Sequence, residues 1–169
     1  MLTTERLTLI PLSLAQLKTG LSSIPCLSDE IHLQLVPGLF EGVVQRAVSM
    51  KIEKMNSQPE SVHDWFTYWL IVITRENLGV GLVGYKGYPD SKGEVEIGYG
   101  IDQAYRRQGY MSEAVDALVK WAFNHPECKR ITAPGVLKEN IGSQRTLVHT
   151  GFDRVGESPT EIDYLLVKE

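Results

Sequence analysis

Cysteine is scarce in this sequence, and the scarcity excludes two common ways of stabilising a small domain. The 169 residues include only Cys26 and Cys128. Two thiols so far apart in a chain make neither a disulfide framework nor a cysteine-based zinc site. The 4 histidines show no metal-ligand spacing either. We therefore expect two ordinary thiols and no metal site.

Long apolar segments are also lacking. Residues 65–74 form a run of ten without a charged side chain, whereas a membrane helix needs about 18. The first residues include Glu5 and Arg6, and they contain no apolar stretch of the kind found in secretory signals. We therefore expect a cytoplasmic protein that has no membrane segment.

The chain has no excess of positive charge. Its 17 Lys and Arg residues stand against 21 Asp and Glu residues, which gives a formal net charge of −4. Because proteins that bind nucleic acid usually present a basic face, we expect no nucleic-acid partner. Low-complexity tracts and repeats are not visible. At about 150 residues per domain, residues 1–169 are predicted to form a single domain, as a monomer or a homodimer.

Hydrophobic periodicity predicts a series of strands and helices. Alternation of apolar and polar residues indicates strands, whereas apolar residues three and four positions apart indicate amphipathic helices. The predicted strands cover residues 7–11, 68–74, 80–85, 94–101, 130–133, 152–156 and 162–167, and the predicted helices cover residues 13–21, 40–55, 111–123 and 143–150. Residues 22–38 are expected to be irregular, and Asp64 can begin a helical turn.

This order of elements predicts a mixed α/β (α+β) fold. Turns at residues 76–79 and 90–93 join three consecutive strands into an antiparallel meander. The expected architecture is a mostly antiparallel sheet of six to seven strands, flanked by about four helices.

One glycine pattern matches a dinucleotide-binding motif but lies in the wrong context. Gly79, Gly81 and Gly84 have the spacing G-x-G-x-x-G. In dinucleotide-binding folds this motif follows a strand and opens a helix, so that phosphate meets free helix amides. The next residues here, 85–90, read Tyr-Lys-Gly-Tyr-Pro-Asp and cannot begin a helix. We interpret the pattern as a strand with small residues after a turn.

Residues 106–113, Arg-Arg-Gln-Gly-Tyr-Met-Ser-Glu, have the right context for binding an anion. They connect the predicted strand 94–101 to the predicted helix 111–123, whose N-terminal amides are unpaired and whose dipole favours negative charge. Gly109 lets the backbone approach a bulky group closely, and the two arginines add positive charge. The segment predicts a pyrophosphate cradle; an exposed basic turn at the start of a helix is the alternative.

The same segment resembles a known family. Residues 106–111, read as Arg-x-x-Gly-x-Met, are similar to the Arg/Gln-x-x-Gly-x-Gly/Ala loop that binds coenzyme A in the GNAT N-acetyltransferases. Residues 96–99 and 109–114 look most like the branch that includes the ribosomal-protein N-terminal acetyltransferases. Residues 140–147 and the opening residues 4–9 also resemble segments of that family.

The resemblance implies acetyl-CoA as co-substrate, with no metal. Residues 99–101 would polarise the thioester carbonyl through their main-chain N–H groups, and the loop with the helix start would hold the pyrophosphate. Asn140 would hold the pantetheine, and Arg145 would meet a phosphate. The implied cofactor-binding residues are Tyr99, Gly100, Ile101, Arg106, Arg107, Gln108, Gly109, Tyr110, Met111, Ser112, Asn140 and Arg145.

Family members also splay the strand before the loop away from the next parallel strand, and pantetheine inserts between them. Gly98 and Gly100 fit a bulged strand end with close backbone approach. Pro134 has no N–H group to donate, so strand pairing should fail there. The alternative is that residues 133–135 only begin a loop.

Two side chains are candidates for the chemistry of acetyl transfer. Glu96 is expected to act as a general base through water, because it lies about 7–13 Å along the strand from the reaction centre; a structural ion pair is the alternative. Ser143 is expected to donate to the leaving thiolate, directly or through water, since the family's usual tyrosine position is Leu147 here. A helix cap is the alternative for Ser143.

The sequence therefore predicts an acetyl-CoA-dependent N-acetyltransferase that moves the acetyl group directly to a primary amine. The acceptor is either a protein N-terminus or a small amine such as a polyamine, an amino acid or an antibiotic. Residues 20–75, where such enzymes usually shape the acceptor site, resemble nothing specific. A coenzyme A-binding module without transferase activity is the other interpretation, because the tyrosine acid is missing.

Overall fold

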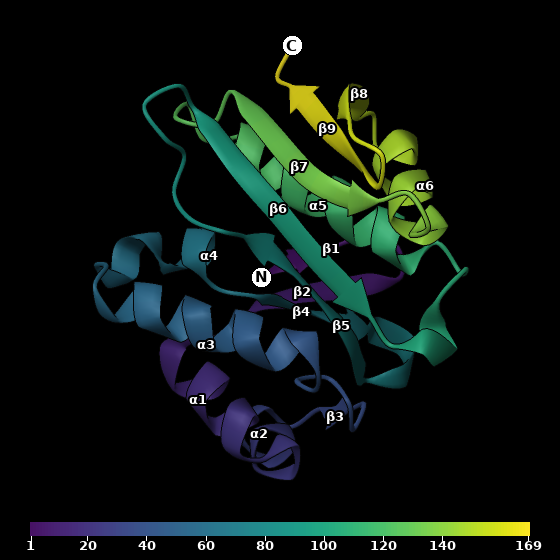
Figure 1. Ribbon diagram of the computed structural model, residues 1–169. Coiled ribbons are helices and arrows are strands. Elements are labelled where there is room, and N and C mark those ends of the chain that lie inside the picture. The colour runs from purple at the N-terminus through teal and green to yellow at the C-terminus, as the bar shows by residue number, and fades with distance from the viewer.

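The computed structural model describes residues 1–169 as a nine-stranded sheet with helices on both faces (Figure 1). The strands are β1 (Leu2–Thr3), β2 (Leu7–Pro11), β3 (Gln34–Leu35), β4 (Trp69–Ile73), β5 (Leu78–Tyr85), β6 (Glu94–Ile101), β7 (Arg130–Leu137), β8 (Asp153–Glu157) and β9 (Glu161–Val167). The helices are α1 (Leu14–Ser22), α2 (Ile24–Ile31), α3 (Val43–Asn56), α4 (His63–Phe66), α5 (Tyr110–Phe123) and α6 (Ile141–His149).

The strand order along the sheet is β1-β2-β4-β5-β6-β7-β9-β8, and β3 pairs with β5. The pairs β6–β7 and β3–β5 are parallel, and the others are antiparallel. In Figure 1, α1 to α4 gather on one side of the sheet, and α5 and α6 lie on the other. The predicted mixed, mostly antiparallel α/β fold is confirmed.

Helix α5 is fixed by the apolar stripe that the sequence predicts. Ala114, Val115 and Leu118 have no exposed surface, because residues three and four apart share the face that packs on the sheet. The Tyr85 hydroxyl at the end of β5 donates to the carbonyl of Leu118 at 2.9 Å. The start of α5 is therefore held at a fixed place beyond the end of β6. None of the helices is long and apolar enough to cross a membrane.

The prediction that residues 22–38 are irregular is wrong. Ser23 caps α2 by accepting the amide of Cys26, and Pro25 lies in the first turn of the helix. Proline is tolerated there because first-turn N–H groups have no partner within the helix. His32 ends the helix in a left-handed conformation, and β3 follows. Helix α2 and strand β3, together with the short β1, were not among the predicted elements, and α4 forms where a helical turn was expected. The structure therefore has nine strands and helices α1 to α6, where six to seven strands and about four helices were predicted.

Strands β6 and β7 pair only briefly and then separate. Their parallel register covers three residue pairs, which are 94 with 130, 95 with 131 and 96 with 132. Beyond this point β6 continues to Ile101 alongside β5, and β7 continues to Leu137 alongside β9. The predicted opening between the central parallel strands is confirmed, and pairing ends two residues before Pro134.

The irregular backbone at this opening lies in β7 and not in β6, where a bulge was predicted. The register between β5 and β6 is continuous from Gly81 with Ile101 to Tyr85 with Ile97. In β7 the register against β9 shifts between Ala133 and Val136. Proline removes an N–H group and Gly135 adopts φ +66°, so these two residues form the bulge and β7 is longer than predicted.

A buried lysine connects α3 to the end of β5. The Lys51 ammonium donates to the carbonyls of Phe66 at 3.1 Å and Tyr85 at 2.6 Å, and it lies 4.3 Å from the centre of the Tyr68 ring. Burial, together with the charges of Lys54 and Lys86, lowers the pKa of Lys51 to about 7.

This lowered pKa predicts how stability depends on pH. Between pH 7 and 9 the unfolded chain keeps the Lys51 proton while the folded chain loses it, so the free energy of unfolding should rise with pH. Lys51 alone should make the free energy of unfolding rise by up to about 1.4 kcal/mol per pH unit. Urea unfolding of wild type and Lys51→Met over this range measures it. The slope should be absent in Lys51→Met and retained in a control, Lys18→Met, and an equal slope in all three contradicts the prediction.

Candidate active site

The loop between β6 and α5 ends in a conformation that suits glycine. Gly109 precedes the first residue of α5 with φ +82°, and no side chain caps the helix. The first-turn N–H groups of α5 are therefore free to bind an anion. Asp102 accepts the amide of Ala104 at 2.9 Å, and Arg106 Nε donates to the carbonyl of Ile101 at 3.3 Å. These bonds fix the start of the loop.

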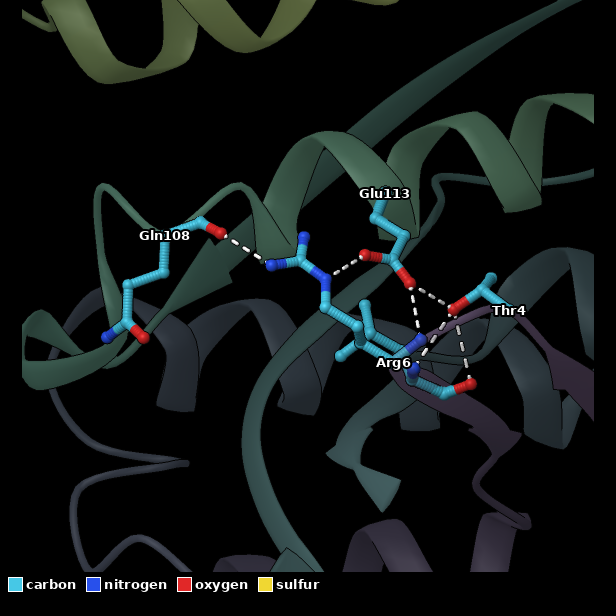
Figure 2. Close-up of polar contacts among 5 residues, drawn as sticks. Thr4, Arg6, Gln108 and Glu113 are labelled. Carbon is cyan, nitrogen blue, oxygen red and sulfur yellow. Dashed lines mark hydrogen bonds and ion pairs between the residues drawn. The ribbon is translucent and has the colours of Figure 1, made fainter. Parts of the chain in front are cut away.

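A network of polar contacts fixes the other end of the loop to the N-terminal strand region (Figure 2). Arg6 Nε contacts Glu113 Oε2 at 2.7 Å, and Arg6 Nη1 donates to the carbonyl of Gln108 at 2.9 Å. The Thr4 hydroxyl and the Arg6 amide both donate to Glu113 Oε1, at 2.5 and 2.9 Å. The guanidinium also lies 4.7 Å from the centre of the Tyr110 ring. The loop before α5 is thus anchored on both sides.

Hydrogen bonding keeps the Glu113 carboxylate ionised in this network. Partial burial opposes ionisation, but hydrogen bonds from Thr4 and Arg6 and the charge of Arg6 together lower the pKa of Glu113. Sequence reasoning did not assign a role to Arg6 or Glu113. The available signal was the resemblance of residues 4–9 to the first strand of the family, which placed Arg6 in a matched segment without saying what it touches.

Removing the Arg6 guanidinium should weaken binding of acetyl-CoA. Arg6→Met loses the bond to Gln108 and a positive charge beside the helix start, so we expect about a 10-fold rise in Kd, equivalent to about 1.4 kcal/mol. Isothermal titration calorimetry measures this change. Arg75→Met removes an exposed arginine ion pair elsewhere and should leave Kd unchanged. An unchanged Kd in a folded Arg6→Met variant would show that the anchor does not matter for binding.

Strand alternation decides which main-chain groups of β6 face the opening. The Asp102 amide donates to the carbonyl of Val80 in β5 at 2.9 Å. Main-chain groups of alternate residues point to the same side of a strand, so Gly100 also pairs with β5. Tyr99 and Ile101 therefore direct their main-chain groups toward the separated β7. Of the three predicted main-chain contacts, this geometry favours Tyr99 and Ile101.

On the α6 side of the sheet, the structure brings two predicted residues together. The hydroxyl oxygens of Tyr99 and Ser143 lie 2.8 Å apart, and the Tyr99 hydroxyl is also 3.3 Å from the carbonyl oxygen of Ser143. Burial raises the pKa of Tyr99 to about 12, an effect that the Ser143 hydrogen bond opposes and Tyr164 reinforces. Tyr99 therefore stays protonated at neutral pH and acts as a hydrogen-bond donor.

Other predicted residues of this region have different surroundings. Asn140 accepts the amide of Ser143 at 3.1 Å and caps α6, so Asn140 and not Ser143 is the helix cap. Helix α6 begins at Ile141 for this reason, two residues earlier than predicted. Arg145 is exposed, and Leu147 has no exposed surface. Because the position of the family's usual tyrosine acid is Leu147 here, α6 has no tyrosine that could act as an acid.

Glu96 lies on the opposite face of the sheet from the Tyr99 side chain. It forms an ion pair with Lys86 and keeps 30% of its side chain exposed. A groove of about 410 Å³ runs beside it, lined by Glu94, Glu96, Thr132, Pro134, Asp163 and their neighbours. Because side chains three residues apart on a strand point to opposite faces, Glu96 lies on one face of the sheet, and Tyr99 with its partner Ser143 lies on the other.

A comparison with protein families agrees with this architecture. The family model described as an acetyltransferase (GNAT) domain matches residues 6–153. The chain belongs to the GNAT acetyltransferase family. The matched region includes the anchored loop, the separated strands and the Tyr99–Ser143 contact of this GNAT domain.

Curated relatives of this GNAT chain come from Bacillus subtilis (strain 168). It is 40% identical to the uncharacterized N-acetyltransferase YjdG over 87 residues, 52% of this chain and 51% of the relative. It is 43% identical to the probable N-acetyltransferase YjcK over 60 residues, 36% of this chain and 33% of the relative. The matches thus span about half of the curated relatives or less.

Solved GNAT structures match nearly the whole chain. A putative ribosomal-protein-serine acetyltransferase from Vibrio cholerae has a TM-score of 0.64 at 20% identity, covering 99% of this chain and 97% of the other. RimL, a ribosomal L7/L12 alpha-N-protein acetyltransferase in complex with coenzyme A, has a TM-score of 0.67 at 15% identity, covering 97% and 95%. At these identities the likeness establishes the shared fold.

Proposed function

We propose that the chain transfers the acetyl group of acetyl-CoA directly to a primary amine. The observation that carries the proposal is the opening between β6 and β7, which lies beside the uncapped N-terminus of α5. An extended thioester fits such a gap, because unpaired strand groups and unpaired helix amides both need partners. When bound, acetyl-CoA supplies the activated acetyl group.

The loop and helix start are the proposed pyrophosphate site. Residues 109–112 would bind the diphosphate through main-chain N–H groups, and the side chains of Arg106 and Arg107 add positive charge. Gln108 and Arg145 would complete the contacts with the nucleotide part. Arg6 and Glu113 hold this loop in shape from the far side.

The strand edge and the flanking carboxylate are the proposed site of chemistry. Main-chain N–H groups of Tyr99 and Ile101 would polarise the thioester carbonyl and stabilise the oxyanion. Glu96 would take a proton from the amine through water, since its side chain lies on the face that borders the groove. The amine nitrogen bonds to the acetyl carbon, and the carbon–sulfur bond breaks with its electron pair on sulfur. Ser143 is the proposed donor to that sulfur, and the proton from the amine finally converts the thiolate to a thiol.

A protein N-terminus or a small amine is the proposed acceptor. The neighbours of similar fold include RimL, named for a ribosomal protein, and the aminoglycoside acetyltransferase AAC(6′)-Ib. Both classes of acceptor carry a primary amine and would bind beside carboxylates such as Glu94 and Asp163 in the groove.

A thiol-release assay tests the proposal. Acetyl-CoA is incubated with the protein and with a panel of N-terminal peptides, polyamines, amino acids and aminoglycosides. We expect release of free coenzyme A with at least one class, together with an acetylated product seen by mass spectrometry. Absence of acetyl-CoA binding would reject the proposal.

A coenzyme A-binding module without transferase activity is the second candidate. Two observations favour it. The position where the family usually has its tyrosine acid is the buried Leu147, and the carboxylate of Glu96 already forms an ion pair with Lys86. Tight binding of acetyl-CoA without release for any acceptor would establish this second function.

A further inference from the structure

Three hydroxyl groups from separate elements lie near one another on the α6 side of the β6–β7 opening. We call Tyr99 of β6, Ser143 of α6 and Tyr164 of β9 the hydroxyl cluster. The Tyr99 and Ser143 oxygens are 2.8 Å apart, and Tyr164 is one of the groups that raise the pKa of Tyr99. Tyr164 lies opposite Ala133 in the register of β9 with β7, next to the point where β7 bulges.

The Tyr164 hydroxyl has no partner within the protein. The side chain is 1% exposed, and its oxygen makes no hydrogen bond. Buried tyrosine hydroxyls normally find a partner, because an unpaired one loses its hydrogen bonds to water without replacement. An unpaired hydroxyl beside an opening that fits a thioester points to a polar atom of the bound ligand.

The Ser143 hydroxyl differs in its bonding from those of Ser22 and Ser49, which also lie in helices. Ser22 and Ser49 each donate to the carbonyl four residues earlier in their own helices, at 3.2 and 3.0 Å. Ser143 makes no such bond, and its hydroxyl is bonded only to that of Tyr99. Either hydroxyl can donate in this bond, and the Tyr99 hydroxyl also lies 3.3 Å from the Ser143 carbonyl oxygen. When Tyr99 donates to the Ser143 hydroxyl oxygen, the Ser143 proton is free to point elsewhere.

We propose that the hydroxyl cluster binds the sulfur atom of coenzyme A, with Tyr99 as a positioning residue that aims the Ser143 proton at the sulfur and Tyr164 as a second donor. The proposal rests on the proposed function. Ser143 and Tyr164 would together replace the tyrosine acid that is missing at Leu147. When the carbon–sulfur bond breaks, its electron pair stays on sulfur, and the two hydroxyl donors stabilise that thiolate until it takes up the proton released by the amine.

The experiment measures the pKa of the coenzyme A thiol while it is bound, by the ultraviolet absorbance of the thiolate. Wild type should lower this pKa relative to free coenzyme A. Ser143→Ala and Tyr164→Phe should each raise the bound value by about one unit, in line with loss of one hydrogen bond to a charged atom. Tyr99→Phe should raise it by a similar amount, because the Ser143 proton is then no longer directed at the sulfur. Tyr88→Phe and Ser22→Ala remove hydroxyls elsewhere and should match wild type.

Desulfo-coenzyme A, which lacks the sulfur, separates this role from a structural one. The cluster variants should bind it within about twofold of wild type, because the lost contact is to sulfur. In turnover, Tyr99→Phe should lower kcat about 10-fold at unchanged KM for acetyl-CoA. The double variant Tyr99→Phe/Ser143→Ala should be no slower than Ser143→Ala alone, since a positioning residue acts through its partner.

The outcomes distinguish the two proposals. If wild type binds coenzyme A but the thiol pKa is the same in wild type and all cluster variants, the sulfur site is overturned and the proposed function stands. If the variants lose affinity for desulfo-coenzyme A as much as for coenzyme A, the cluster is structural and the inference is overturned. If wild type binds no coenzyme A, both proposals fail together.

Discussion

Gly109→Val should reduce the affinity for acetyl-CoA about 100-fold, equivalent to about 2.7 kcal/mol. The residue has φ +82°, which a β-branched side chain adopts only under strain of about 1–3 kcal/mol. A side chain there would also meet Arg6 Nη2, which lies 3.1 Å from the position of a Cβ atom. The helix amides would turn away, and the branched side chain would occupy the space that we propose for the diphosphate.

Calorimetry with acetyl-CoA measures this loss, and a matched variant separates it from general instability. Gly42→Val imposes at least as much backbone strain, at φ +61° and ψ −131°, and no atom lies within 4 Å of the added Cβ. It should lower stability without changing Kd. Gly109→Ala should give an intermediate Kd. If Gly109→Val binds as tightly as wild type, the loop does not hold the pyrophosphate.

Glu96→Gln should lower kcat about 100-fold near neutral pH and leave the affinity for acetyl-CoA unchanged. The substitution keeps the shape of the side chain but removes its ability to accept a proton. The deficit should shrink as pH rises, because an acceptor amine that is already neutral needs no base. Steady-state rates over a range of pH values, with an acceptor found in the thiol-release assay, measure both effects.

Glu94→Gln is the control for this variant. Glu94 lies on the same strand and face, two residues farther from the opening, and pairs with Arg130 at 3.9 Å. Loss of the Glu94 carboxylate should change kcat by less than about threefold, because an exposed ion pair contributes little free energy. A Glu96→Gln enzyme with the wild-type kcat would exclude Glu96 as the base, and Lys86 would then be its structural partner.

Local patterns predicted the elements that local physics controls. The apolar stripe of α5 and the meander of β4 to β6 were predictable because each depends on side-chain spacing and turn residues within a short stretch. The same reasoning failed for residues 22–38, where Pro25 was treated as a helix breaker although it lies in the first turn of α2. It also placed the bulge in β6, because glycine permits a bulge but does not require one.

The candidate site divides in the same way. The loop at residues 106–109 was predictable, since the glycine and the following helix are adjacent in the chain. The partner of Ser143 was not, because Tyr99 is 44 residues away and meets it only through the packing of α6 on the sheet. Strand alternation alone could have shown that Glu96 and Tyr99 face opposite sides.

By itself, the sequence determined that this chain has a mixed α/β fold with a glycine-containing loop directly before an amphipathic helix. Only the tertiary structure decided what supports that loop and what faces the opening. Arg6 and Glu113 are 107 residues apart, and the buried Tyr164 hydroxyl has no hydrogen-bond partner in the protein. Such contacts depend on how strands from distant parts of the chain lie side by side, and a pattern that repeats every two or four residues carries no information about them.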